Sequence, residues 1–365
     1  MMRSRLYYGL TAALAATAGQ ADHIEELVVT ASHDTRTIDV VNTVQVSPDI
    51  AQLLKEAPGA NVNSNGPITG IPQYRGMYGP RIATSLNGIQ LAPAGPNWMD
   101  PPISYAVTAQ LESLEVYRGI APVSVAQESI GGAIDAHTYH GDFGNTHKFT
   151  ASGKVMASAQ SVNDGYQVDA NLYATNNQHR IKVAAMTQAG DDAEFPGGTI
   201  TPSEYERQRY DLGYGFRIGP HSVQFDYGYN DTGEAGTPAL PMDIEYFEGD
   251  LYDLTYRFDL PGDTEVKASI YASELDHGMT NYHLRLPPEP ANWRRNIATS
   301  DNIGFDLHTR LYDPQGSFVF GFDGFKAKHN SDIDNPNNPM FYVVNFNKAE
   351  REVLGAFLER HHEFD

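Results

Sequence analysis

The second half of the chain alternates apolar and polar residues with a period of two. Residues 166–174, 223–229, 252–258 and 303–308 each carry apolar side chains at every second position, and many of these are aromatic. Successive side chains of a β-strand point to opposite faces, so each segment predicts a strand with one apolar and one polar face. Segments of about ten such residues with aromatic ends are typical of transmembrane β-barrels. Soluble β-sandwiches give the same alternation, so the pattern alone leaves both architectures open.

The connections between these segments alternate between short and long. In a transmembrane barrel the short turns face the periplasm and the long loops face outward. We expect roughly ten or eleven strands over residues 146–365, ending within a strand. The short connections are 175–177, 261–263 and 313–315, and the long ones are about 189–204, 230–248, 275–300 and 326–349.

The N-terminus predicts export from the cytoplasm. Arg3 and Arg5 precede a short apolar stretch, and Ala16-Thr17-Ala18 has the pattern of a cleavage site. This combination predicts a secretory signal peptide at residues 1–18. The alternative is the start of an amphipathic helix in a soluble protein. No run of 18 or more apolar residues follows, so the sequence predicts no transmembrane helix.

Composition excludes several functions. The net charge of −21 argues against nucleic acid as a partner, because phosphate binding needs clustered Lys and Arg. The absence of cysteine excludes disulfides and thiolate metal sites. We find none of the phosphate-loop, dinucleotide-binding, zinc-protease or serine-hydrolase motifs, and therefore expect no enzyme, no catalytic residues and no tightly bound cofactor.

Residues 38–145 predict a small α+β domain. Residues 49–59 form an amphipathic helix that Pro58-Gly59 ends. Residues 81–91 read as two short strands around Asn87-Gly88, a strong hairpin signal. A further strand at 111–119 leads to Gly131-Gly132. Upstream, residues 24–31 form a β-prone run that a partner's sheet edge could complete.

In this order the segments resemble the plug domain of TonB-dependent outer-membrane receptors. The resemblance implies an α+β plug domain followed by an antiparallel transmembrane β-barrel, incomplete here with roughly 10–11 of an expected 22 strands. It implies a signal peptide at 1–18, a TonB box and linker at 19–37, a plug at 38–145 and a partial barrel at 146–365. The predicted TonB-binding residues are Glu26, Leu27, Val28, Val29, Thr30 and Ala31.

The same resemblance implies location and partners. We expect the cell outer membrane, contact with its lipid, coupling to the periplasmic TonB complex, and a monomer. The family also implies polar contacts from Glu115 and Arg118 to the barrel wall, with exposed strand-end charges as the alternative. The segment 125–129 departs from the family pattern, and Asn87 replaces the usual Asp of the hairpin.

Two segments carry candidate ligand chemistry. Met99 lies in the proline-rich stretch 94–102, and His277 and Met279 lie two positions apart in a predicted long loop. In an extended segment, residues i and i+2 project to the same side. Imidazole with thioethers suits copper, although an isolated Met or His-x-Met pattern is more often structural.

These segments also resemble the copper-receptor branch of the family, whose plug Cys-x-x-x-Met and loop His-x-Met pairs surround copper. Position by position, the resemblance implies Met99, His277 and Met279 as metal ligands, whereas Gly95 stands where the family has cysteine. The segments concerned are 75–79, 96–102, 236–243 and 276–281. Fallback ligands are Met77, Met242 and His283, each of which also has a structural interpretation.

The leading hypothesis is therefore a receptor that transports copper or a copper complex. The alternative within transport is a receptor for a siderophore or another organic metal chelate, with Trp98, Tyr282 and Trp293 as binding residues. Two further hypotheses are a signalling receptor, for which residues 20–23 leave no room for an extra domain, and a truncated gene whose product has no function.

Overall fold

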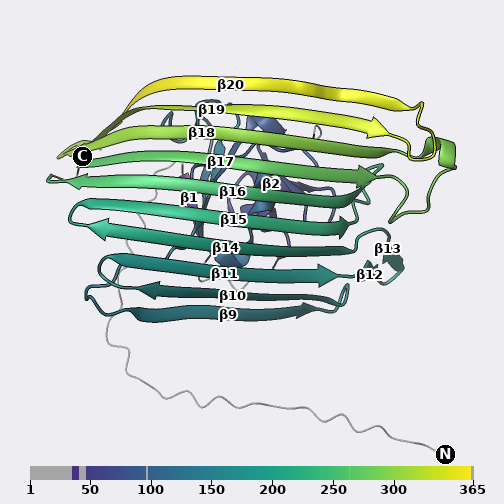
Figure 1. The fold of residues 1–365 in the computed structure, drawn as a ribbon, viewed down its shortest axis with the longest axis horizontal. Coiled ribbons are helices and arrows are strands. Elements are labelled where there is room, and N and C mark those ends of the chain that lie inside the picture. Colours follow the sequence, from purple (N-terminus) through teal and green to yellow (C-terminus); the bar gives the residue numbers. More distant parts are fainter. Residues whose placement is uncertain (1–34, 41–46, 96–97, 263, 363–365) are drawn as a thin grey trace, which may run out of the picture.

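A computed structural model describes residues 35–40, 47–95, 98–262 and 264–362. They form a small mixed domain and a ten-stranded sheet (Figure 1). The predicted signal peptide and TonB box lie outside the described residues. Among the described residues, no helix is long and apolar enough to cross a membrane.

The small domain, called the plug below, contains a five-stranded and a three-stranded sheet joined by short 3₁₀ helices. The five-stranded sheet has the order β1-β7-β8-β5-β6, with β5 and β8 parallel. Its elements are β1 (Thr35–Asp39), η1 (Ile50–Glu56), β2 (Ala60–Ser64), β3 (Gly70–Tyr74), β4 (Met77–Tyr78), η2 (Gly79–Arg81), β5 (Ala83–Leu86), β6 (Ile89–Gln90), η3 (Pro102–Tyr105), η4 (Thr108–Gln110), β7 (Leu111–Tyr117) and β8 (Ala133–Thr138).

Local sequence explains two plug elements. Asp49 caps η1, since its Oδ1 accepts a hydrogen bond from the Ala51 N–H, an interaction that favours a helix start. The predicted helix at 49–59 therefore exists, although as a 3₁₀ helix. The hairpin between β5 and β6 turns at Asn87 and Gly88, both with positive φ (56° and 82°), as a type I′ turn requires.

The ten-stranded sheet, called the wall below, is antiparallel throughout and has the order β20-β19-β18-β17-β16-β15-β14-β11-β10-β9. Ten strands agree with the expected number. Its strands are β9 (Thr150–Gln160), β10 (Gly165–Thr175), β11 (His179–Gly190), β14 (Tyr205–Ile218), β15 (His221–Ala235), β16 (Asp243–Leu260), β17 (Thr264–Thr280), β18 (Arg295–Asp313), β19 (Gly316–Asp334) and β20 (Tyr342–His362). A small hairpin, β12 (Ala193–Phe195) and β13 (Gly198–Ile200), and η5 (Pro290–Asn292) lie in its connections.

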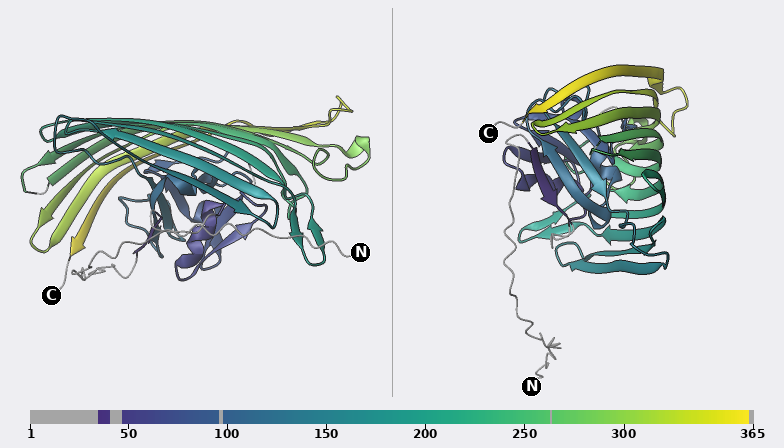
Figure 2. Two further views of the ribbon diagram at one scale, coloured as in Figure 1. Left: turned by 90° about the horizontal axis from the view of Figure 1, so that it is seen from below. Right: turned by 90° about the vertical axis from the view of Figure 1, so that its left-hand side faces the viewer.

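The wall is curved and holds the plug on its concave side (Figure 2). The alternation of apolar and polar residues along its strands is opposite to that of a soluble protein, in which the apolar residues face inward. On β10 the apolar residues Tyr166, Val168 and Leu172 are exposed on the outer face, whereas Gln167 and Asp169 are buried toward the inside. Apolar residues outside and polar residues inside are the pattern of a transmembrane barrel strand. The expected fold, a plug followed by part of an antiparallel barrel, is confirmed.

The predicted long loops are shorter than expected because the strands continue into them. β17 extends to Thr280 and β18 begins at Arg295, so the loop predicted at 275–300 spans only 281–294. His277 and Met279 therefore lie in a strand, and the prediction that they belong to a loop was wrong. Cross-strand pairing with Phe247 and Ala298 holds His277 in the sheet.

Two arginines of β14 connect the wall to the plug backbone. Arg207 donates from Nη1 to the Ser104 carbonyl and from Nη2 to the Pro48 carbonyl, both at 2.9 Å. Arg209 donates to the Tyr105 carbonyl and pairs with Asp211 at 2.7 Å. Buried arginines thus donate to backbone carbonyl groups of the plug and join it to the wall.

Glu115, which the family resemblance placed against the wall, has its ion-pair and hydrogen-bond partners in the plug sheet. It accepts a hydrogen bond from the Tyr117 hydroxyl and lies 3.7 Å from His137 Nε2, while Asp135 lies 3.4 Å from the same nitrogen. Burial lowers the pKa of His137, but the two carboxylates outweigh burial and raise that pKa above its usual 6.5.

Candidate functional site

The predicted metal-ligand residues come from both sides of the boundary between plug and wall. Met99 lies in the plug between β6 and η3, whereas His277 and Met279 lie on β17 of the wall. The three side chains are almost fully buried, with exposed fractions of 7%, 1% and 0%. Met99 and Met279 belong to one apolar cluster that joins the plug to the wall. The site thus has a plug half and a wall half.

His277 is buried without hydrogen bonds. Neither ring nitrogen forms one within the described part of the chain. The nearest ring is Phe247, whose centroid lies 6.3 Å from that of His277 in an edge-to-face arrangement. Buried polar atoms of native proteins nearly always have hydrogen-bond partners, which makes this imidazole a candidate for ligand binding.

Asp100 is the polar group nearest to this imidazole, and the sequence had not indicated it. Its Oδ1 lies 3.4 Å from His277 Nδ1, and both side chains are fully buried. The carboxylate accepts hydrogen bonds from the N–H groups of Ala94 and Gly95, both at 2.7 Å, and from the Tyr105 hydroxyl at 2.9 Å. The one feature of the sequence that could have indicated Asp100 is its position next to Met99.

These contacts lower the pKa of the Asp100 carboxyl. Burial by itself raises its pKa, but the neighbouring His277 and the hydrogen bonds from Gly95 and Tyr105 outweigh burial, so the pKa is lowered. The site therefore contains a buried carboxyl group beside a buried imidazole.

Gly95 lies at the centre of this arrangement. A Cβ placed on it would be 2.6 Å from Asp100 Oδ1 and 2.9 Å from His277 Nδ1. Both distances are shorter than real Cβ contacts, so the close approach of plug loop, carboxylate and imidazole depends on glycine at this position. The position where the family resemblance implies a cysteine thus lies directly against the candidate ligand His277.

The fallback ligands have other roles. His283 uses both ring nitrogens, one with the Thr280 hydroxyl and one with the Ile244 carbonyl. Met242 packs against the apolar cluster, and Met77 is half-buried in β4. Over the described ranges, no group of three or more His, Asp or Glu residues is arranged to hold a metal ion. A metal site here would therefore need the thioether groups.

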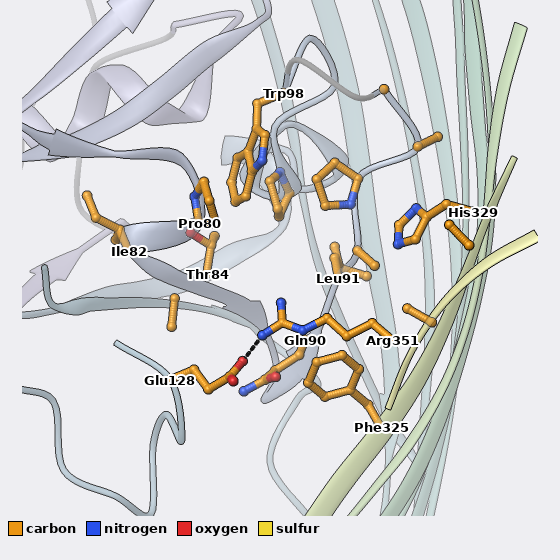
Figure 3. A pocket seen from close by; sticks show the side chains of 18 of the residues that line it. Pro80, Ile82, Thr84, Gln90, Leu91, Trp98, Glu128, Phe325, His329 and Arg351 are labelled. Carbon is orange, nitrogen blue, oxygen red and sulfur yellow. Dashed lines mark hydrogen bonds and ion pairs between the residues drawn. The ribbon is translucent and has the colours of Figure 1, made fainter. Parts of the chain in front are cut away.

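A cavity of about 290 Å³ adjoins this region (Figure 3). Trp98 and Pro80 line it from the plug, and Phe325 and His329 line it from β19. Arg351 of β20 reaches across it and pairs with Glu128 of the plug. Gly95 also lines the cavity, which places this open space next to the His277 site.

The aromatic residues proposed for an organic ligand do not form one group. Tyr282 and Trp293 stack on each other in the 281–294 loop, with ring centroids 4.5 Å apart. Trp98 instead lines the cavity on the plug.

Comparison with known proteins identifies the plug. Residues 29–133 match the family model described as "TonB-dependent Receptor Plug Domain". A curated protein described as WRKY transcription factor 8, from Arabidopsis thaliana, is 30% identical over 95 residues, which cover 23% of this chain and 28% of that protein. This coverage is too small to assign a family.

Solved structures resemble the whole arrangement of plug and wall. The copper transporter OprC matches with a TM-score of 0.78 and 23% identity over 89% of this chain and 52% of its own. The pyoverdine outer membrane receptor FpvA of Pseudomonas aeruginosa PAO1 matches with a TM-score of 0.61 and 13% identity over 88% and 53%. At these identities the likeness concerns the fold, and the chain spans about half the length of either protein. The chain therefore contains a TonB-dependent receptor plug domain and has the fold of the plug and part of the barrel of TonB-dependent receptors.

Proposed function

We propose that this chain is part of a TonB-coupled import receptor of the outer membrane. The cargo of this receptor is a copper ion or a copper complex. The observation that carries the cargo proposal is His277, a fully buried imidazole on β17 whose two nitrogens form no hydrogen bond among the described residues. Met279 follows it on the same inner face of the strand, and the plug segment with Met99 closes over that face.

The donor types support copper among the metals. Thioether groups are soft ligands that favour Cu(I), and imidazole binds copper readily. Hard ions such as Mg²⁺ and Ca²⁺ need several oxygen ligands, whereas the one carboxylate beside His277 is already engaged by three donors. The name of the structural relative OprC, a copper transporter, agrees with this cargo.

The division of the site between plug and wall supplies a release mechanism. Met99 moves with the plug, whereas His277 and Met279 stay with β17. A force that displaces the plug would separate the two halves and lower the affinity for the cargo. In this proposal, Glu26, Leu27, Val28, Val29, Thr30 and Ala31 pair with TonB and transmit that force, and residues 1–18 direct export.

Metal analysis of the purified receptor tests the cargo proposal. We expect copper bound to the unmodified protein and little copper bound to Met99→Ala and His277→Ala. Met340→Ala is a matched control, because Met340 is 92% exposed in the connection between β19 and β20 and its loss leaves the buried site intact. Equal copper content in all four proteins would refute the proposed site.

A second candidate cargo is an organic metal chelate, which the cavity of about 290 Å³ favours. Trp98 and Phe325 offer aromatic faces, and Arg351 offers a positive charge for an anionic group. Trp98→Ala separates the two cargoes, because it removes a cavity wall and leaves the Met99 and His277 side chains in place. Loss of chelate uptake with unchanged binding of the free ion would favour the chelate.

A further inference from the structure

Two cavities follow one another between the plug and β19. The first is the cavity of about 290 Å³ beside Gly95, and the second has a volume of about 110 Å³. Gln90 of β6 and Phe325 of β19 line both cavities, so the two meet at these residues. His329 lines the first and Asp323 lines the second, so the row of cavities runs along β19 toward the short turn that precedes this strand.

The second cavity is lined by charged and polar side chains. Lys267, Asp306 and His308 of the wall face it, and Asp306 Oδ1 lies 2.7 Å from His308 Nδ1. Its volume accommodates several water molecules, each of which needs about 10–15 Å³. In a transmembrane barrel the short turns face the periplasm, so this polar cavity lies on the periplasmic side of the first.

The plug segment 124–128, called the latch below, borders both cavities and bonds to the last two strands of the wall. Ser124 donates from its N–H and its hydroxyl to Glu359 Oε2 of β20, at 3.1 and 3.0 Å. Gln127 donates to the Asp323 carbonyl group at 3.2 Å and also to the Asp323 carboxylate. Most of the latch belongs to the segment 125–129 that departs from the family pattern. These contacts hold the plug against β19 and β20.

The plug is fixed more tightly on the side of β14. The cavity lined there by Asn87 and Asp211 has a volume of about 20 Å³. Arg207 and Arg209 are each 2% exposed and donate to plug carbonyl groups. In contrast, the ion pair between Arg351 and Glu128 of the latch has both side chains about half exposed, at 55% and 54% (Figure 3).

The two kinds of contact differ in strength. Hydrogen bonds from a buried charged group are strong, whereas water and salt screen exposed ion pairs, which therefore contribute little. A force on the plug should therefore separate it from β19 and β20 before it separates it from β14.

We propose that the cargo leaves its site along this row of cavities, and that the latch opens the route when the plug is pulled. The released ion enters the first cavity at Gly95, passes between Gln90 and Phe325, and reaches the polar cavity on the periplasmic side. This inference rests on the proposed function, because it assigns an exit to the proposed cargo site.

A reversible cross-link across the latch provides the first test. The chain contains no cysteine, so introduced cysteines are its only thiols. Ser124→Cys with Glu359→Cys is joined in cells by a short bifunctional methanethiosulfonate, which a reducing agent removes. We expect the cross-link to abolish uptake of radioactive copper ion and reduction to restore it. The restored uptake shows that the variant is folded.

The matched control joins the plug to the wall on the other side. Ala109→Cys with Asn171→Cys replaces a plug-to-wall contact in which Asn171 Nδ2 lies 3.1 Å from the Ala109 carbonyl oxygen. We expect this cross-link to leave copper uptake unchanged. Unchanged uptake with the latch cross-linked would overturn the route, and loss of uptake with the control pair cross-linked would overturn the one-sided opening.

Thiol labelling provides a test that does not depend on the cargo. Ser269→Cys lies in the wall of the second cavity, and Gln188→Cys is the control at a position 2% exposed on the side of β14. Both are exposed to a maleimide in cells with and without TonB. We expect TonB to speed the labelling of Ser269→Cys and to leave that of Gln188→Cys unchanged. An equal effect on both positions, or no effect on Ser269→Cys, would overturn the inference.

The outcomes also separate this inference from the proposed function. A receptor that takes up no copper ion, but in which TonB speeds the labelling of Ser269→Cys alone, would remove copper as the cargo and keep the opening along β19. Copper uptake that persists with the latch cross-linked would keep the cargo and remove the route.

Discussion

Replacement of Gly95 by alanine tests the geometry of the site with the smallest possible change. The added Cβ would lie 2.6 Å from Asp100 Oδ1 and 2.9 Å from His277 Nδ1, whereas ordinary van der Waals contact begins at 3.4 Å. The carboxylate and the imidazole must therefore retreat by about 0.8 and 0.5 Å, respectively, or the plug loop must shift.

Such movement has a calculable cost. The Asp100 carboxylate accepts two backbone N–H bonds at 2.7 Å, and a retreat of about 0.8 Å would stretch a bond to roughly 3.5 Å, beyond the range of hydrogen bonding. Overpacking of a buried site costs about 1–3 kcal/mol, and a weakened hydrogen bond adds about 1 kcal/mol. We therefore expect Gly95→Ala to destabilise the folded protein by about 2–4 kcal/mol.

Denaturant unfolding and Cu(I) titration measure the two consequences. We expect a lower unfolding midpoint and Cu(I) binding weaker by at least about tenfold, since 1.4 kcal/mol corresponds to a factor of ten. Gly95→Cys has the same steric cost but adds a thiolate, so it should bind Cu(I) more tightly than Gly95→Ala. Wild-type stability and affinity in Gly95→Ala would refute the close approach of Gly95, Asp100 and His277.

Three further changes test the fold around the site. Arg209→Met leaves the buried Asp211 unpaired and should lower the free energy of unfolding by about 3–5 kcal/mol. The double variant with Asp211→Leu should recover much of this lost free energy. An additive loss in the double variant would contradict the pairing. The pKa of His137 is raised in the folded state, so its protonation stabilises the fold fully below pH 6.5. This stabilisation is lost as the pH rises through the folded-state pKa, and the melting temperature should fall there. His137→Gln should abolish this dependence of the melting temperature on pH. Leu54→Ala, at a fully buried position of η1, should cost about 2–5 kcal/mol in denaturant unfolding, and a smaller loss would mean that the plug core collapses around the cavity.

The elements that depend on local sequence were predictable. Asn87-Gly88 specifies its hairpin because both residues tolerate positive φ, and the alternation along 166–174 specifies a strand because side chains alternate across a sheet. The order of the plug motifs predicted the family that residues 29–133 match. The strand ends were less predictable, since β17 continues to Thr280 through hydrogen bonds to its neighbours that a single sequence does not reveal.

The sequence by itself determined the residue types that can bind a soft ion and the period that places His277 and Met279 on one face of a strand. Only the tertiary structure decided that this face is buried against the plug, because burial depends on how a curved sheet packs around a separate domain (Figure 2). It also decided that Asp100 lies beside His277. A carboxylate becomes a charge partner of an imidazole only when residues 177 positions apart approach within 3.4 Å, and the absence of a side chain at Gly95 permits that approach.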